Sequence, residues 1–375
     1  MPVSMPVETE TPTSPFVALH LKYRPTILSD LVGQESVKST LTNAIKSNHI
    51  VPAYMFCGTR GSGKTSTARA FARALNCLES KTPTVTPCGE CASCRGISNG
   101  SDIDVIELDA ASNNGVDDVR ELIERAGFSP VRGRWKAIII DEVHELSSRA
   151  QNALLKTLEE PPQKVVFMLA TTDPQKVLST IMSRCQVHTF KRLHELEIAR
   201  HLEKICEWEG IKAEPDGLVA IAALAEGGLR NALTLLGKLA DSSPITLATV
   251  QADSSGVPEE MMMSCIAALF KKDMGKVVAA IQALMDTGHE SSRILEAMIR
   301  LYRDLTVLTV APGAIEQLFA APKHHVALVY IAEHWGAARI YKGLDVLIQA
   351  EYHIQKTAFP RLWAEVTLIR LGGLD

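Results

Sequence analysis

The pattern of apolar and polar positions divides the chain into three stretches. From about Phe16 to Arg192, short apolar runs alternate with segments in which apolar residues recur at helical spacing. The four runs are residues 54–56, 104–108, 137–140 and 165–170. Such runs are typical of parallel strands, because helices cover both faces of a parallel sheet. The pattern therefore predicts an open α/β sheet with buried strands in the domain 16–192.

The two remaining stretches are predicted to be helical. Residues 193–257 are rich in Ala and Leu at helical spacing, with a break at 227–228. Residues 258–375 show the same spacing, with breaks near 287–288 and 311–313. Basic and acidic residues are nearly balanced in this last stretch. Packing against other helices is therefore a simpler interpretation of it than nucleic-acid binding.

Composition and charge narrow the class of protein. The 375 residues include 39 Lys+Arg and 43 Asp+Glu, which gives a formal net charge of −4. This balance excludes a protein held to nucleic acid by bulk positive charge, although a local basic surface is compatible with it. No apolar run approaches the ~18 residues that a membrane span needs. We therefore expect no membrane partner.

The N-terminal segment has no feature of an export signal. The first fifteen residues, MPVSMPVETETPTSP, are rich in Pro and contain acidic but no basic side chains. A secretory signal needs a basic start and an apolar middle, so residues 1–15 are predicted to be a disordered tail. Without an export signal, the eight cysteines point to reduced thiols or a metal rather than disulfides. We expect a soluble, cytoplasmic protein.

A phosphate-binding loop follows the first apolar run. The motif G-x-x-x-x-G-K-[ST] is matched in full by Gly58, Thr59, Arg60, Gly61, Ser62, Gly63, Lys64 and Thr65, and Ser66 follows it. Glycines let the backbone N–H groups and a helix N-terminus point at phosphate. Lys64 is predicted to reach the β- and γ-phosphates, and the Thr65 hydroxyl to ligate Mg²⁺. The alternative is a glycine-rich turn with an accidental Lys-Thr pair.

An acidic pair supplies the second half of the site. The apolar run 137–140 ends in Asp141 and Glu142, which would lie beside the loop if the run is a central parallel strand. Asp141 is predicted to hold Mg²⁺ through water, and Glu142 to polarise the water that attacks the γ-phosphate. A strand ending in Asp-Glu is common by itself. Together with the phosphate loop, it indicates a nucleoside triphosphatase that uses ATP and Mg²⁺.

Four cysteines lie in a Pro/Thr/Gly-rich insertion at residues 77–94. They are Cys77, Cys88, Cys91 and Cys94, spaced Cys-x10-Cys-x2-Cys-x2-Cys. Close pairs on tight turns with a more distant partner can place four sulfurs around zinc. We predict a structural Zn²⁺ site, because four thiolates leave no position open for a substrate. A redox Cys-x-x-Cys motif and free buried thiols are the alternatives.

The order of these motifs resembles the gamma/tau subunit family of bacterial DNA polymerase III, the motor of sliding-clamp loaders. The matching stretches are Tyr23-Arg24-Pro25, Val32-Gly33-Gln34-Glu35, the phosphate loop, the cysteine insertion, DAASNNGVDDVRE (109–121), IIIDEVHELS (138–147), ALLKTLEEPP (153–162), ATTDPQKV (170–177), Ser183-Arg184-Cys185 and Gly228-Leu229-Arg230-Asn231-Ala232-Leu233. The resemblance is dense from about 16 to 240 and vaguer beyond. It implies an AAA+ ATPase domain, a helical lid (193–257) and a helical collar (258–375) that joins subunits.

The resemblance also implies roles for residues outside the two main motifs. Thr172 would be a sensor near the attacking water, preferred over its neighbour Thr171. Arg184 would be an arginine finger that acts on ATP bound to the neighbouring subunit. Arg230 would project from the lid onto the γ-phosphate of its own subunit's ATP. For both arginines, a surface position or an ion pair with a nearby acid is the alternative.

The resemblance also implies residues for the base pocket and for a DNA-facing surface, although less directly. The resemblance places Tyr23, Arg24 and Val32 against the adenine, although residues of these types there could equally be core. It also presents helix N-termini to the DNA backbone, which makes Asn113 and Arg120 candidates for phosphate contacts. An ordinary capped surface helix is the alternative for this last pair.

The function implied by the resemblance is that of a motor subunit. Copies of this chain would assemble with delta and delta-prime subunits into a pentamer, open a sliding clamp, and release it closed around primer–template DNA after ATP hydrolysis. The alternatives are another AAA+ DNA motor, such as a branch-migration helicase, and a nucleotide-binding scaffold subunit. The chain ends at Asp375, where the collar would end, so we expect a short gamma-like product or a shortened tau.

Overall fold

The computed structural model describes residues 17–240, 244–250, 257–286, 289–354 and 356–374. The predicted tail at 1–15 and the predicted break at 287–288 lie outside the described residues. The chain forms two compact units, Met1–Val250 and Gln251–Asp375. Each unit has its own hydrophobic core, and the first also contains a separate cluster in its helical C-terminal part.

The first unit contains a five-stranded parallel sheet of order β2-β3-β4-β1-β5. The strands are β1 (Ala53–Gly58), β2 (Val105–Asp109), β3 (Lys136–Asp141), β4 (Val165–Thr171) and β5 (Gln186–Phe190). The four predicted runs are therefore strands. Two details differ from the prediction. β2 is a partly exposed edge strand, and β5 was not predicted, because its exposed and buried positions alternate as expected of an edge.

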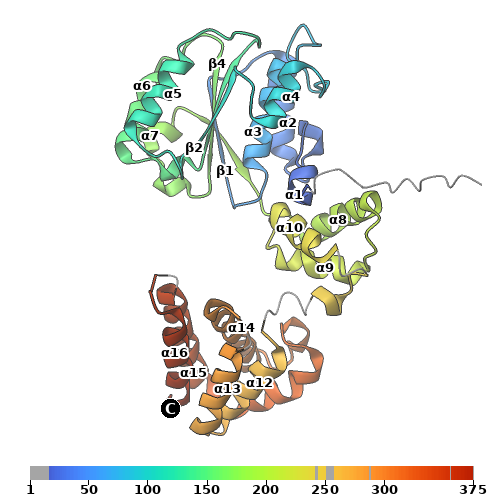
Figure 1. The fold of residues 1–375 in the computed structure, drawn as a ribbon, viewed down its shortest axis with the longest axis vertical. Coiled ribbons are helices and arrows are strands. Elements are labelled where there is room, and N and C mark those ends of the chain that lie inside the picture. Colours follow the sequence, from blue (N-terminus) through green and yellow to red (C-terminus); the bar gives the residue numbers. More distant parts are fainter. Residues whose placement is uncertain (1–16, 241–243, 251–256, 287–288, 355, 375) are drawn as a thin grey trace, which may run out of the picture. The chain divides into compact units, whose positions relative to one another are not determined.

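Side chains of alternate strand positions build the two faces of the sheet. Met55, Ile138 and Phe167 pack against α5, α6 and α7 on one face, and their immediate neighbours pack against α2 and α3 on the other (Figure 1). This alternation follows from the two-residue period of a strand. Because both faces are covered, β1, β3 and β4 are almost wholly buried, as the continuous apolar runs predict.

Helices cover the sheet, and after β5 the described part of the first unit is helical. Those of the α/β part are α1 (Leu19–Lys22), η1 (Leu28–Asp30), α2 (Glu35–Ser47), α3 (Lys64–Asn76), α4 (Ala92–Asn99), α5 (Val116–Ala126), η2 (Val143–Glu145), α6 (Ser148–Glu159), η3 (Pro174–Lys176) and α7 (Ser179–Met182). A lid follows, built of α8 (Glu195–Glu209), α9 (Pro215–Leu224) and α10 (Leu229–Leu239). The lid helices pack on one another around a core that includes Leu202, Ile221 and Leu236.

The second unit is all helical over its described residues. Its elements are α12 (Glu259–Phe270), α13 (Met274–Asp286), α14 (Ser291–Val310), η5 (Ile315–Gln317), α15 (Pro322–Ile354) and α16 (Pro360–Gly372). The longest helix, α15, is interrupted at Gly336, whose φ of 74° favours glycine. Gly343 of α15 packs directly over the ring of Tyr302 in α14. The predicted fold class, an α/β domain with a small helical lid followed by an all-α region, is confirmed.

Candidate nucleotide-binding site

A pocket of about 770 Å³ lies at the carboxyl ends of the strands, between the α/β part and the lid. Its wall includes the whole segment 59–66, the ends of β3 and β4, the segment around α1, and α10 of the lid. Of the predicted nucleotide-site residues, those that line it are Tyr23, Arg24, Val32, Thr59–Ser66, Asp141, Glu142, Thr172 and Arg230. Gly58 lies at the end of β1 beside this wall, and Arg184 is not among the lining residues.

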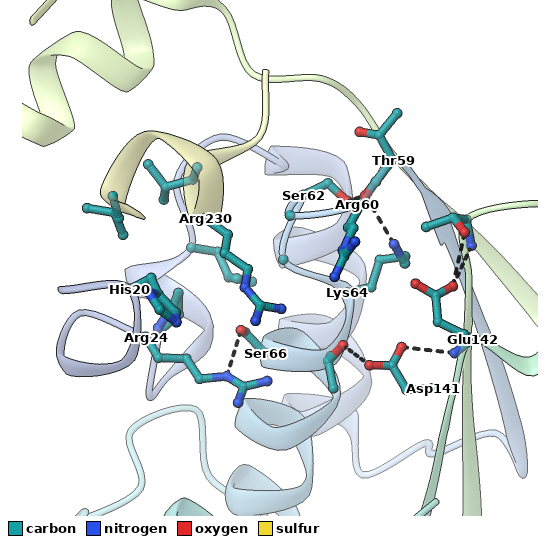
Figure 2. A pocket seen from close by; sticks show the side chains of 18 of the residues that line it. His20, Arg24, Thr59, Arg60, Ser62, Lys64, Ser66, Asp141, Glu142 and Arg230 are labelled. Atoms are coloured by element: carbon teal, nitrogen blue, oxygen red, sulfur yellow. Dashed lines mark hydrogen bonds between the residues drawn. The ribbon is translucent and has the colours of Figure 1, made fainter. Parts of the chain in front are cut away.

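The phosphate loop connects β1 to α3 with the backbone turned by glycines. Gly61 and Gly63 have φ values of 79° and 101°, which residues other than glycine rarely adopt. The Lys64 Nζ donates to the carbonyls of Gly58 (2.8 Å) and Thr59 (3.1 Å), so the ammonium lies across the loop (Figure 2). The buried Thr59 hydroxyl has no hydrogen-bond partner among the described residues. The loop therefore contains a buried ammonium and a buried hydroxyl that a ligand could contact.

Burial affects the charge of Lys64. The residue is only 5% exposed, and this desolvation lowers the pKa of its ammonium, while the nearby carboxylates of Glu142 and Asp141 act in the opposite direction. A buried cation that donates only to backbone carbonyls lacks a direct anionic partner. The site is thus suited to an anionic ligand that would supply this partner.

The acidic pair lies directly opposite the start of α3. The Thr65 hydroxyl donates to Oδ2 of Asp141 at 2.6 Å, and the backbone N–H of Glu142 donates to Oδ1 at 3.0 Å (Figure 2). Glu142 follows the strand with φ of 48°, a strained conformation for a residue with a side chain. A hydroxyl and a carboxylate brought together beside a phosphate loop are the donor types that Mg²⁺ takes in such sites, so these residues fit the ion.

The end of β4 holds the Glu142 side chain. Its Oε2 accepts hydrogen bonds from the backbone N–H of Thr172 (3.1 Å) and from the Thr172 hydroxyl (3.0 Å). Thr171, by contrast, is fully buried, and its hydroxyl lies 3.1 Å from Nδ1 of His144. The structure thus brings Thr172, the preferred sensor candidate, onto the predicted catalytic carboxylate.

Two arginines approach the loop from the other side of the pocket. Arg230 projects from α10 of the lid into the pocket, and its Cβ is 3.4 Å from where a Cβ on Gly61 would lie (Figure 2). Arg24 donates from Nε to the Ser66 hydroxyl at 3.1 Å. Burial and then the neighbouring Arg69 lower the pKa of Arg24. Together with Lys64, these cations make the pocket favourable for a polyanion.

The lid also contacts the segment that precedes the loop. The ring of Tyr23 stacks on Trp208 at a centroid distance of 5.6 Å, and its hydroxyl donates to Glu209. Lys22 forms an ion pair with the same Glu209 carboxylate at 2.6 Å. Burial, followed by the hydrogen bond to Glu209, raises the pKa of Tyr23 to about 12. Tyr23 and Val32 pack against the lid core as well as lining the pocket.

Arg184 and the DNA-facing candidates lie outside the pocket. Arg184 forms an ion pair with Glu159 and donates to the carbonyl of Thr180 at 2.7 Å, so the alternative that we considered for it, an ion pair with a nearby acid, is present. Arg120 on α5 pairs with Asp117, and Asn113 donates to the carbonyl of Asp109. Arg120 and Asn113 are exposed.

The four cysteines of the insertion gather at one point. The Sγ atoms of Cys77, Cys88, Cys91 and Cys94 all lie within 4.8 Å of one another, and those of Cys88 and Cys94 are 3.9 Å apart. Four thiolates bound to one Zn²⁺ at about 2.3 Å would be separated by about 3.8 Å. Backbone N–H groups of residues 78, 88, 91 and 94 donate to these sulfurs at 3.3–3.4 Å. The donor set and its spacing fit zinc.

Arg134 connects this cysteine module (residues 77–94) to the loop before β3 (residues 131–135) through hydrogen bonds. Its Nε, Nη1 and Nη2 donate to the carbonyls of Leu75 (3.0 Å), Ser80 (2.7 Å) and Cys77 (2.8 Å). The buried Asn76 accepts from the backbone N–H groups of Arg134 and Trp135 and donates to the carbonyl of Trp135. The end of α3, the cysteine module and the loop are therefore connected by six hydrogen bonds.

Asp104 holds the other end of the same loop. Its carboxylate is fully buried and accepts from the backbone N–H groups of Val131, Arg132 and Gly133 at 2.6–2.7 Å. Burial acts to raise the pKa of Asp104, but these hydrogen bonds outweigh it, and the pKa is lowered. This contact corrects the predicted run 104–108, because Asp104 precedes β2 and caps a loop instead of belonging to the strand.

Several pocket residues were not predicted from the sequence. His144, Glu145 and Asp109 line the pocket beside the acidic pair, and His20 lines it near the lid. His144 and Glu145 lie within the segment 138–147 that carried the family resemblance, so their spacing from Glu142 was a usable signal. Asp109 ends β2, the same position that Asp141 occupies on the adjacent strand. His20 had no such signal, because its place depends on packing against the lid.

Three family models match successive parts of the chain. A model described as DNA polymerase III, delta subunit, matches residues 33–194. The model for the ATPase lid domain of the DNA polymerase III clamp loader subunit matches 197–238. The model for domain III of DNA polymerase III subunits gamma and tau matches 256–374. Among the described residues, no helix combines the length and the hydropathy required to cross a membrane.

Curated relatives are similar along nearly the whole chain. DNA polymerase III subunit tau of Bacillus subtilis is 39% identical over 95% of this chain, which spans 63% of that protein. Subunit tau of Escherichia coli is 41% identical over 82% of this chain, which spans 48% of it. Subunit gamma of Buchnera aphidicola is 32% identical, and the alignment covers 94% of this chain and 96% of that protein. The chain thus spans about half to two thirds of the tau relatives.

Solved structures with similar architecture include the RuvB Holliday junction branch migration motor of Thermotoga maritima. Its TM-score is 0.47 at 18% identity, with 61% of this chain and 71% of that chain covered. The clamp loader delta protein of Bacillus subtilis aligns with a TM-score of 0.37 at 15% identity, covering 89% of this chain and 99% of the other.

Proposed function

The chain belongs to the family of DNA polymerase III gamma and tau subunits, as its motifs predict, and on that premise we propose that it is the ATP-hydrolysing motor of a clamp loader. The observation that carries the proposal is the meeting, in one pocket, of Lys64 and Thr65 with Asp141 and Glu142. A scaffold subunit that only binds nucleotide would not need all four. The reaction is hydrolysis of the γ-phosphate, and polymerisation belongs to other subunits of the holoenzyme.

The phosphate loop and the acidic pair hold the substrate. Lys64 exchanges its bonds to the loop carbonyls for bonds to the β- and γ-phosphates, and the loop N–H groups bind the same oxygens. Thr65 and Asp141 would hold Mg²⁺. When bound, this ion neutralises charge that develops on the phosphate oxygens. Tyr23 and Val32 flank the base, at the side of the pocket that the lid closes.

Glu142 orients and polarises the attacking water. Its carboxylate lies in the pocket at the end of β3, and Thr172 holds one oxygen through two hydrogen bonds. The second oxygen is then the one that accepts a hydrogen bond from water. Thr172 acts as the sensor by linking this carboxylate to the end of β4, so that a change at the γ-phosphate is passed to the strand.

Two arginines complete the site from different subunits. Arg230 contacts the γ-phosphate of the ATP in its own pocket and ties the lid to nucleotide state. Arg184 leaves its ion pair with Glu159 and reaches the ATP of a neighbouring subunit, where a cation stabilises the transferring phosphoryl group by about 10³-fold or more in other NTPases. The active site is therefore completed only by assembly.

Assembly and DNA complete the cycle. Copies of this chain form a pentamer with delta and delta-prime subunits, the all-helical second unit serving as the collar. The complex binds and opens a sliding clamp, and primer–template DNA triggers hydrolysis and release. Asn113 and Arg120, both exposed near the N-terminus of α5, face the DNA phosphates. On this proposal the protein works in the cytoplasm.

The cysteine module binds a structural Zn²⁺ through Cys77, Cys88, Cys91 and Cys94, whose Sγ spacing suits one ion. Metal analysis of the purified chain should give one zinc per chain, and Cys88→Ser should remove it. Cys185→Ser is the matched control, because Cys185 packs against the hydrophobic cluster on one face of the sheet and is not one of the four clustered cysteines. Zinc retained by the Cys88→Ser variant would contradict this assignment.

Steady-state ATP hydrolysis tests the motor function. The chain is assembled with delta, delta-prime and the clamp, and the rate is measured with and without primed DNA. We expect a large rise that requires both the clamp and a primer–template junction, and we expect Arg184→Ala to keep ATP binding but lose this rise.

Other outcomes would redirect the proposal. A rate that ignores the clamp and rises with branched or plain DNA would favour a branch-migration motor. Tight nucleotide binding without turnover would favour a scaffold subunit that binds nucleotide but does not hydrolyse it. A normal DNA response in the Arg184→Ala complex would remove Arg184 from the role of arginine finger.

A further inference from the structure

His144 occupies a buried position between the two strand ends that carry the catalytic groups. It lies in η2, two residues after Glu142, and its side chain is only 8% exposed. Its Nδ1 is 3.1 Å from the Thr171 hydroxyl and 3.4 Å from Oε2 of Glu142. Its Nε2 is 3.1 Å from a carboxylate oxygen of Glu145. Both ring nitrogens therefore have polar neighbours.

Polar contacts hold the ring at both of its nitrogens. An ionised carboxylate can only accept, so Nε2 carries a hydrogen that it donates to Glu145. At the other ring nitrogen, Nδ1 shares a hydrogen bond with the Thr171 hydroxyl. The Thr171 oxygen accepts in turn from the backbone N–H of Asp173 at 3.0 Å. Through the Thr171 hydroxyl, His144 is thus connected to the backbone N–H of Asp173, on the far side of Thr172.

Thr172 is the residue that holds the Glu142 carboxylate. Its backbone N–H and hydroxyl both donate to Oε2, and their directions depend on the conformation of the chain at residues 171–173. The Thr171 hydroxyl helps to hold that conformation, because it is bonded to His144 and accepts from the backbone N–H of Asp173. A buried side chain that fixes the support of a catalytic group contributes through orientation, not through contact with the substrate.

We propose that His144 is a positioning residue for ATP hydrolysis, which holds the end of β4 so that Thr172 orients the Glu142 carboxylate toward the attacking water. The inference rests on the proposed function, because it assigns Glu142 to the water. The effect runs through Nδ1, and the contact of Nε2 with Glu145 anchors the ring. Loss of the ring leaves phosphate binding by the loop intact and weakens the chemical step.

Replacing His144 by Asn and by Gln tests the contributions of the two ring nitrogens separately. The Asn amide reaches the place of Nδ1, and the longer Gln amide reaches the place of Nε2. The full chain is assembled with delta, delta-prime, clamp and primed DNA, and kcat, the KM for ATP and the Kd for nucleotide are measured. His188→Asn is the control, since His188 is also buried but lies on β5, outside the pocket lining.

We expect His144→Ala to lower kcat roughly ten- to a hundredfold with the Kd and KM for ATP within about twofold. His144→Asn should recover most of kcat, His144→Gln should not, and His188→Asn should turn over like the unmodified chain. Recovery by Gln equal to that by Asn, or a weakened Kd with unchanged kcat, would overturn the inference. If the alanine variant does not fold, the Asn–Gln pair decides.

A failure of the proposed function has a different signature. If the unmodified complex binds ATP but does not hydrolyse it, the motor assignment is wrong, and the role of His144 falls with it. If the unmodified complex hydrolyses ATP and all three His144 variants match it, only the inference about His144 is wrong.

Discussion

The nucleotide pocket and the cysteine module with its attached loop use polar side chains in opposite ways. In the pocket, Lys64 donates to carbonyls of its own loop and Thr65 donates to Asp141, so the groups that would bind a ligand are paired with one another. In the loop at 131–135, buried Asp104 and Asn76 bind consecutive backbone N–H groups. A ligand could replace the hydrogen-bond partners of the pocket side chains, whereas Asp104 and Asn76 keep their backbone partners in the loop.

This difference separates side chains that bind a ligand from side chains that stabilise the fold. A side chain whose bonds a ligand can replace contributes little to the free energy of folding, because its partners in the folded chain are exchangeable. A bond between buried groups that no ligand reaches contributes fully to folding, and its removal leaves an orphaned donor or acceptor. Changes in the pocket should therefore affect ATP turnover, and changes in the loop should affect stability.

The largest expected effect is on turnover in the pocket. Lys64→Ala removes the cation that we propose binds the β- and γ-phosphates, and we expect ATP hydrolysis to fall by about 10³-fold, or about 4 kcal/mol in transition-state stabilisation. The free energy of unfolding should stay the same or rise slightly, because a buried cation is lost. The measurements are steady-state ATPase rate, nucleotide binding and chemical denaturation.

Lys46→Ala is the matched control for that experiment, since Lys46 is exposed on α2 and outside the pocket lining. Its turnover should equal that of the unmodified chain. A Lys64→Ala variant that unfolds several kcal/mol more easily would mean that the pocket is part of the structural support, and the contrast between the two regions would not hold.

The second effect is the loss of the guanidinium that joins the module to the loop. Arg134→Ala leaves three carbonyls without their donor, and we expect the free energy of unfolding to fall by about 3 kcal/mol. Nucleotide affinity should be unchanged. Hydrogen exchange should show lost protection of the amides of residues 131–135. Arg132→Ala, next to it but exposed, should leave both readouts as they were.

The third effect depends on pH. Because the pKa of Asp104 is lowered in the folded chain, its contribution to stability is complete above the unfolded value near ~3.9 and is lost as the pH falls through the folded pKa. Asp104→Asn should cost about 2 kcal/mol at neutral pH. The difference from the unmodified chain should shrink below about pH 4, as measured by denaturation across pH. A constant difference would contradict the assignment.

The smallest effect is expected at a side chain that the loop leaves in solvent. Val131 is 72% exposed while its backbone N–H is bound by Asp104. Val131→Ser should therefore change the free energy of unfolding by less than about 0.5 kcal/mol. A loss above 1 kcal/mol in the same denaturation assay would show that the loop is held by its side chains and not by its backbone.

The sequence predicted the pocket better than the loop, and the reason is physical. Phosphate binding needs particular residues at fixed spacing, so the segment 58–65 and the pair Asp141–Glu142 were visible as motifs. The supports of the loop come from residues far apart in the chain, such as Asn76 and Arg134, which are ordinary polar residues until the fold brings them together.

The same reasoning applies to the strands. Buried β1, β3 and β4 are continuous apolar runs, and the sequence shows them clearly. The edge strand β5 contains the sequence QVHTF, in which three positions are exposed. Val, Thr and Phe favour strands, but they form no continuous apolar run. His144 was missed for a related reason, since its proposed role depends on Thr171, which lies at the end of β4 and far from it in the sequence.

The order of strands has a consequence for synthesis on the ribosome. β1, the earliest strand to emerge, pairs only with β4 and β5, for example Cys57 with Thr171 and Gly58 with Phe190. The phosphate loop therefore leaves the exit tunnel more than a hundred residues before the strands that fix its position. A nascent chain shorter than this has no place for ATP, so nucleotide can act as a stabilising ligand only after the whole sheet has been translated.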